Sequence, residues 1–244
     1  IVERGSVLRR CKHMPLDAAK GVRMEGEHFS ATQIAYDGIR RMIFVTHELR
    51  PGQKLVESTV AQKLCISRTP VREAIHRLQQ DGILERIPNR GSFVCIPKKR
   101  DIVHSYEIVA ALSAMSCYII AEAVSEGRDL SEIFQSLDDA CEAMDAASAE
   151  GNRELWLMLD RDFHYYIAVH SGNERLTSLF RHAHEMVYHD VWQFPSRVID
   201  ADNSCREHHA IVDAMRAGET IRAHELELRH MMRTRESIRN MEFE

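Results

Sequence analysis

The sequence predicts a mainly α-helical protein of two modules, and three observations support this fold class. Apolar residues recur at helical spacing along most of the chain. Only 11 Gly and 6 Pro occur in 244 residues, so strong helix breakers are few. Charge divides the chain, because residues 1–100 hold 19 Lys and Arg against 10 Asp and Glu, whereas residues 101–244 hold 13 against 27. The basic first part therefore suits a polyanionic partner.

Composition also places the module boundaries. We expect a flexible basic tail over residues 1–28, a first module over residues 29–97 and a second over residues 98–244; no Lys follows Lys99. The tail lacks the apolar stretch of a secretory signal, and apolar runs elsewhere stop far short of the roughly 20 residues of a membrane span. The six cysteines form no Cys-x-x-Cys pair. We therefore expect a cytoplasmic protein with no membrane partner.

The first module begins with three predicted helices. Apolar spacing predicts one over residues 31–46, which the segment Arg50-Pro51-Gly52-Gln53 ends, and a short one over residues 57–64. The third helix has a sharp start, since Ser67 or Thr69 can cap it and the following Pro70 suits a first turn. It ends at Gly82, a typical residue after a helix C-terminus.

A basic hairpin follows these helices. Residues 83–86 and 92–95 are predicted strands, joined by Pro88-Asn89-Arg90-Gly91. Two helices separated by a tight turn and followed by a hairpin are the order of elements in a winged helix-turn-helix.

The third helix carries basic side chains on its outer face. Val71, Ile75 and Leu78 form the inward stripe, so Arg68 and Arg72 lie near the opposite face. An isolated arginine pair is usually a solvated helix surface. The capped helix start and the basic wing favour the alternative, in which the arginines reach guanine edges or phosphates in a major groove.

Several stretches of this module resemble the DNA-binding domain of GntR-family bacterial transcription regulators, over about residues 31–96. They are Leu49-Arg50-Pro51-Gly52-Gln53-Lys54-Leu55-Val56-Glu57, Ile66-Ser67-Arg68-Thr69-Pro70-Val71-Arg72-Glu73-Ala74-Ile75, Asp81-Gly82 and Asn89-Arg90-Gly91. The resemblance implies that the recognition helix and the wing tip contact DNA. The residues we expect to do so are Ser67, Arg68, Thr69, Arg72, Arg90 and Gly91.

The sequence of the second module predicts an all-helical antiparallel bundle of about six helices. Helical periodicity is found throughout, with breaks at Gly127, Gly151, Gly172, Pro195 and Gly218. The helices expected between these breaks span residues 101–125, 129–149, 152–170, 173–193, 203–216 and 219–240.

Four polar side chains of this bundle form a candidate metal site. Asp160 and His164 are four residues apart and share one helical face, while His208 and His230 lie on the last two predicted helices. A lone histidine on an apolar face is more often a hydrogen-bonded core group. Three imidazoles and a carboxylate together suit Zn, Ni or another first-row divalent metal. His182, His184 and His189 share no single face, and we interpret them as surface or pocket-rim groups.

The second module resembles the FadR-type C-terminal domain, called FCD. The resemblance is carried by Leu159-Asp160-Arg161-Asp162-Phe163-His164, Ser171-Gly172-Asn173-Glu174-Arg175-Leu176, Glu207-His208-His209-Ala210-Ile211, Gly218-Glu219 and Arg229-His230. It implies that Asp160, His164, His208 and His230 bind a metal, and it makes Asn173 our candidate effector-binding residue. The family usually has an Arg and, four residues later, a Glu on the first helix of this domain, where this chain has Val109 and Ser113.

These observations predict a ligand-responsive bacterial transcription regulator. It would bind a palindromic operator in double-stranded DNA as a homodimer, with a divalent metal and a small carboxylate metabolite as effector in the second module. In the family this Arg commonly lies near the effector. Because Val109 replaces it, a second carboxylate of the effector would lack its most obvious partner, and monocarboxylates and hydroxy acids are favoured over di- and tricarboxylates. One alternative is a metal-dependent enzyme that uses the Asp/His site to activate water, although no His-Glu-x-x-His motif occurs. The other is a regulator for which the metal itself is the signal.

Overall fold

The computed structural model describes residues 30–244 apart from residues 45, 97, 193–199 and 241–244. The tail predicted over residues 1–28 and the break predicted at Pro195 lie outside the described residues. The chain divides into two compact units, with the boundary between Lys98 and Lys99. The mainly helical fold class is confirmed, with a small three-stranded sheet in the first unit and six helices in the second.

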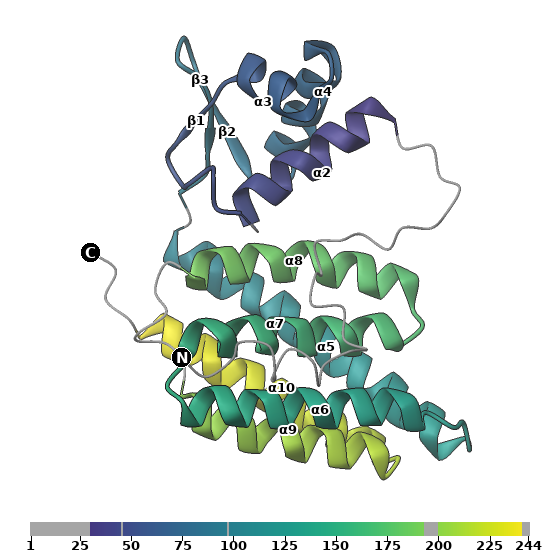
Figure 1. The fold of residues 1–244 in the computed structure, drawn as a ribbon. Coiled ribbons are helices and arrows are strands. Elements are labelled where there is room, and N and C mark those ends of the chain that lie inside the picture. Colours follow the sequence, from purple (N-terminus) through teal and green to yellow (C-terminus); the bar gives the residue numbers. More distant parts are fainter. Residues whose placement is uncertain (1–29, 45, 97, 193–199, 241–244) are drawn as a thin grey trace. The chain divides into compact units, whose positions relative to one another are not determined.

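The first unit is a winged helix-turn-helix (Figure 1). Its elements, in chain order, are α2 (Ala31–Phe44), β1 (Lys54–Leu55), α3 (Glu57–Leu64), α4 (Arg68–Gln80), β2 (Leu84–Ile87) and β3 (Gly91–Val94). The sheet is antiparallel, with the strand order β1-β3-β2. The sequence predicted the three helices and the hairpin but not β1, which at two residues is too short to show alternation.

Buried apolar side chains from all three helices hold this unit together. Ile39 and Ile43 of α2 pack with Val71 and Leu78 of α4, and each is almost fully buried. Helix α2 and helix α3 approach closely at Gly38, where a Cβ atom would lie 2.8 Å from the Leu64 side chain. The apolar stripe of α4 therefore faces inward as predicted, which leaves its polar face outside.

The wing turns through a three-residue connection between β2 and β3. Asn89 adopts a left-handed conformation with φ of 60°, and Gly91 follows with φ of 108°. A Cβ atom at Gly91 would also lie 3.2 Å from Lys54 Cε. Position 91 therefore favours glycine for its backbone conformation, whereas the Lys54 side chain could shift to admit a Cβ atom.

In the residues that the structure describes, the second unit is a bundle of six helices (Figure 1). They are α5 (Lys99–Ser125), α6 (Ser131–Ala149), α7 (Arg153–His170), α8 (Glu174–Trp192), α9 (Ala201–Arg216) and α10 (Thr220–Arg239). Every end lies within two residues of its predicted position. The connection between α9 and α10 shows why glycine marks a helix end so well. Gly218 has φ of 70°, which favours glycine, and a Cβ atom there would lie 3.2 Å from the backbone nitrogen of Ser125.

Helix α5 is the central element of the bundle and packs against α7, α8, α9 and α10. By length and composition it is long and apolar enough to cross a membrane, with a mean hydropathy of 1.8 over its most apolar window. Half of that window is buried inside the bundle, and Ile102, Val109 and Ile120 are among the buried side chains of the whole helix. Its apolar character is that of a core helix.

Candidate functional site

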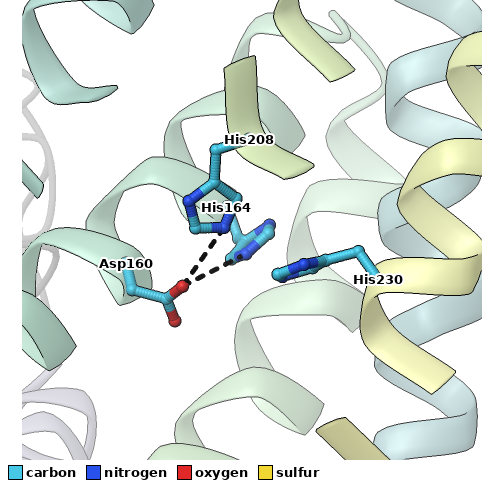
Figure 2. Close-up of side chains that lie close together, drawn as sticks. All are labelled: Asp160, His164, His208 and His230. Atoms are coloured by element: carbon cyan, nitrogen blue, oxygen red, sulfur yellow. Dashed lines mark ion pairs between the residues drawn. The ribbon is translucent and has the colours of Figure 1, made fainter. Parts of the chain in front are cut away.

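Four polar side chains meet in the interior of the bundle (Figure 2). Asp160 and His164 come from α7, His208 from α9 and His230 from α10. Each offers one ligand atom, and these four atoms all lie within 4.8 Å of one another. All four residues are buried. The site residues predicted from the sequence are thus brought together, although they are as much as 70 positions apart in the chain.

The carboxylate of Asp160 is the centre of this arrangement. Its Oδ1 atom lies 3.3 Å from His208 Nε2 and 3.7 Å from His164 Nε2. The imidazole centroids of His164, His208 and His230 are 4.7 to 5.2 Å apart. One turn of α7 separates Asp160 from His164, so the helix itself places both side chains on the same face.

Unsatisfied nitrogens show that these residues fit a cation. Both ring nitrogens of His208 and Nε2 of His164 are buried and make no hydrogen bond with any described residue, whereas Nδ1 of His164 faces the Glu227 carboxylate at 3.1 Å. Buried polar atoms are nearly always paired, so these unpaired nitrogens of two imidazoles call for a further group. Three imidazoles and one carboxylate are a donor set that suits zinc and other first-row divalent ions. The cluster can therefore hold a metal ion.

Burial and mutual charge shift the pKa values of these groups in opposite directions. Burial alone would lower the pKa of His164, but the carboxylates of Glu227 and Asp160 outweigh it and raise this pKa to about 10. Burial lowers the pKa of His208 to about 4, against the opposing effect of Asp160. Burial raises the pKa of Asp160, yet its contacts with His164 and His208 hold it well below the usual value. Without a cation, His164 carries the positive charge that balances this cluster.

Two further carboxylates lie behind the cluster, and the sequence analysis did not assign them a role. Glu227 Oε1 is 3.1 Å from His164 Nδ1, and Glu207 Oε2 is 2.7 Å from His230 Nδ1. Arg233 Nη2 donates to Glu207 at 2.7 Å. The signal for Glu227 was its place on α10, since it is three residues before His230 and shares the buried face of that helix.

A small pocket borders the cluster. Among the described residues, its lining combines apolar side chains with three hydroxyl groups and three histidines and includes no Lys or Arg: Tyr106, Val109, Trp156, Asp160, His164, His184, Val187, Ser204, His230, Met231 and Thr234. His184 is 2% exposed and stacks on Phe180, so it is not a surface group, but it lines this pocket, in line with the pocket-rim alternative. Asn173 is not part of this lining; it is exposed, and its side chain accepts a hydrogen bond from Leu176 N at the start of α8.

The two positions that depart from the usual FCD pattern lie beside the pocket and the polar cluster. Val109 lines the pocket. Ser113 is fully buried, and its hydroxyl donates to Glu227 Oε1 at 2.5 Å. A hydroxyl on α5 is therefore connected to the candidate metal site through a carboxylate on α10.

In the first unit, the predicted DNA-contacting residues are all exposed. Arg72 donates to Glu57, from Nη2 at 2.9 Å and from Nε at 3.3 Å. Arg90 lies over the Phe93 ring, with Cζ 5.4 Å from its centroid. Ser67 is the N-cap of α4 with extended backbone angles, but its side chain makes no capping hydrogen bond, contrary to the prediction. These side chains are accessible to a partner from solvent.

The fold and the site define a regulator that joins a winged DNA-binding unit to a helical bundle with an internal polar cluster. The model of the bacterial regulatory proteins of the gntR family matches residues 31–94, and the model of the FCD domain matches residues 107–233. The chain belongs to the GntR family of transcriptional regulators, in the branch with a C-terminal FCD domain. This family membership excludes the metal-dependent enzyme considered from the sequence.

Similar proteins agree with this assignment. An uncharacterized HTH-type transcriptional regulator of Agrobacterium vitis is 35% identical over 130 residues, which are 53% of this chain and 74% of the relative. The HTH-type transcriptional regulator LutR of Bacillus subtilis (strain 168) is 28% identical over 206 residues, 75% of this chain and 90% of LutR. The solved structure of E. coli McbR/YncC has the same fold, with a TM-score of 0.66, 20% identity and coverage of 84% of this chain and 94% of that one.

Proposed function

We propose that this protein is a ligand-responsive transcription regulator that binds a palindromic operator as a homodimer and changes its DNA affinity when a small carboxylate binds beside a divalent metal in the bundle. The observation that carries the proposal is the buried Asp160, His164, His208 and His230 cluster with its unsatisfied imidazole nitrogens, next to a pocket.

The DNA part of the proposal assigns base contacts to α4. Arg68 and Arg72 are one turn apart near its N-terminus and exposed, which suits bidentate contacts to guanine in a major groove. Ser67 and Thr69 would contact the backbone beside them. The wing tip, Arg90 and Gly91, would lie against the neighbouring minor groove.

Dimerisation is assigned to the bundle. The outer face of α5 carries apolar side chains, because Ile108 is 55% exposed and Met115 is 42% exposed, two turns apart on one helical face. Such a stripe beside a buried core face is what a second copy of the chain could cover. A two-fold axis through two bundles would place two winged units on the half-sites of a palindrome.

The metal part of the proposal favours zinc or nickel. The residues that would hold the ion are Asp160, His164, His208 and His230. A bound ion would supply a doubly positive charge to a pocket whose described lining contains no Lys or Arg. Cys205 is not a candidate ligand, because it lies outside the four-residue cluster and accepts a hydrogen bond from Trp156 Nε1 at 3.3 Å.

The effector part of the proposal follows from the same lining. One carboxylate would be attracted to the ion, but a second would meet no Lys or Arg in the part of the lining that the structure describes. The hydroxyl groups of Tyr106, Ser204 and Thr234 offer hydrogen bonds to a neutral polar group instead. We therefore favour a monocarboxylate or hydroxy acid. Our candidate Asn173 has a structural use as the cap of α8, and we place the effector contacts on the pocket side chains.

DNA binding with and without metal and effector tests this proposal. The protein is loaded with zinc or stripped with a chelator, and its affinity for the DNA upstream of its own gene is measured by fluorescence anisotropy with a panel of organic acids. We expect at least one small acid to change the affinity of the zinc-loaded protein by ~5- to 150-fold. A change of affinity on zinc addition alone would favour the metal as the signal, and the absence of any DNA binding would contradict the proposal.

We expect the protein to act in the cytoplasm, where its DNA partner lies.

A further inference from the structure

Glu227 is a buried carboxylate that the proposed metal and effector sites do not use. It lies on α10 and is 0% exposed. Its Oε1 atom is 3.1 Å from His164 Nδ1 and accepts a hydrogen bond from the Ser113 hydroxyl at 2.5 Å. Its Oε2 atom is buried and makes no hydrogen bond with any described residue. Charged groups are almost never buried to this extent without a partner, so the partner of Glu227 indicates its role.

The contact with Glu227 fixes which nitrogen of His164 can bind a cation. When Nδ1 carries a hydrogen that it donates to Glu227, the lone pair of the neutral ring lies on Nε2. Nε2 is the nitrogen that lies 3.7 Å from Asp160 Oδ1, on the side of the candidate metal site (Figure 2). Glu227 and Asp160 therefore lie at opposite nitrogens of one imidazole.

A second imidazole of the cluster has the same arrangement. His230 Nδ1 lies 2.7 Å from Glu207 Oε2, which Arg233 also contacts at 2.7 Å. The two carboxylates differ in their surroundings, because Glu207 has a guanidinium partner and is 23% exposed in its side chain, whereas Glu227 is fully buried. The charge of Glu227 is thus balanced by the cluster itself.

We propose that Glu227 is a positioning residue of the metal centre: it holds the Nδ1 hydrogen of His164 so that Nε2 binds the ion, and Ser113 fixes the orientation of its carboxylate. The inference rests on the proposed function, since it requires that the cluster binds a metal. Partners of this kind orient ligating histidines, and their loss typically weakens metal binding by ~10- to 100-fold. The alternative is a purely structural role, in which Glu227 only balances buried charge.

Zinc affinity separates these two roles. The dissociation constant for zinc is measured by competition with a chromophoric chelator for the full-length protein, for Glu227→Gln and Ser113→Ala, and for the control Glu225→Gln, an exposed residue on the same helix. We expect Glu227→Gln to bind zinc ~10- to 100-fold more weakly and Ser113→Ala to shift in the same direction by a smaller factor. Glu225→Gln should match the wild type.

Two further readouts keep the test decisive. Cobalt(II) replaces zinc, and its visible absorption bands should shift in Glu227→Gln but not in Glu225→Gln, because the geometry of one ligand changes. Circular dichroism melts of the metal-free proteins report folding, and if Glu227→Gln does not fold, the affinity and cobalt spectrum of Ser113→Ala decide. Wild-type affinity and an unchanged cobalt spectrum in a folded Glu227→Gln overturn this inference alone. Failure of the wild type to bind any metal overturns the proposed function with it.

Discussion

The pH dependence of metal binding is the prediction that the structure sharpens most. Because the Glu227 and Asp160 carboxylates outweigh burial and raise the pKa of His164 to about 10, the metal-free protein holds a proton there at neutral pH. A metal ion must displace this proton. The pKa of His208 is about 4 and that of Asp160 lies well below its usual value, so neither group competes. One proton, from His164, therefore competes with the ion from about pH 6.5 to about pH 10.

The magnitude follows from this single proton. One competing proton changes the apparent affinity about tenfold per pH unit, so zinc binding should tighten roughly 100-fold between pH 6.5 and 8.5. The folding stability of the metal-free protein changes with pH in the opposite direction to its zinc affinity. The raised pKa of His164 stabilises the fold fully below pH 6.5, and this stabilisation is lost as the pH rises towards 10. A rise of this size corresponds to at most ~4 to 5 kcal/mol of folding stability.

Calorimetry measures the zinc affinity and the number of released protons directly. Zinc is titrated into the metal-free protein at several pH values between 6.5 and 8.5, in pairs of buffers with different ionisation enthalpies, so that the number of released protons is obtained with the affinity. We expect about one proton released across this range. The reasoning would be refuted by an affinity that levels off above pH 7, the behaviour of imidazoles with unperturbed pKa values.

Three further predictions concern single side chains. Arg72→Ala should weaken binding to the selected operator by about 1 to 3 kcal/mol, towards the lower end because Arg72 must first give up its bonds to Glu57; full affinity in anisotropy titrations would contradict this. Arg90→Ala should weaken binding to all sequences alike and reduce the slope of log affinity against log salt by about one unit; an unchanged slope would exclude a phosphate contact. His208→Ala should remove the metal, whereas His209→Ala, which loses only an exposed pair with Asp145 at 2.9 Å, should keep it; elemental analysis of both proteins checks this.

The sequence predicted the helices well because their end signals are local. A glycine such as Gly218 needs only its own backbone angle to end a helix, and Asp160 and His164 need only helical spacing to share a face. The metal cluster as a whole was predicted by resemblance as well as by spacing. No local pattern states that His208 and His230 face the same point of the bundle.

The parts that the sequence did not predict depend on contacts between distant elements. Strand β1 forms only because Lys54 and Leu55 pair with β3. The buried hydrogen bond from Ser113 to Glu227 joins residues 114 positions apart. The surface alternative for His184 was wrong because helical spacing shows which residues share a face but not which neighbouring helix covers that face.

The metal content of the protein as purified tests the central claim most directly. Wild-type protein is prepared without added metal, and its zinc and nickel are quantified by mass spectrometry beside the matched pair His208→Ala and His209→Ala. We predict about one divalent ion per wild-type and His209→Ala chain, and little in His208→Ala. Metal absent from the wild type, even after incubation with excess zinc, or equal metal in all three proteins would contradict the assignment of this cluster as a metal centre.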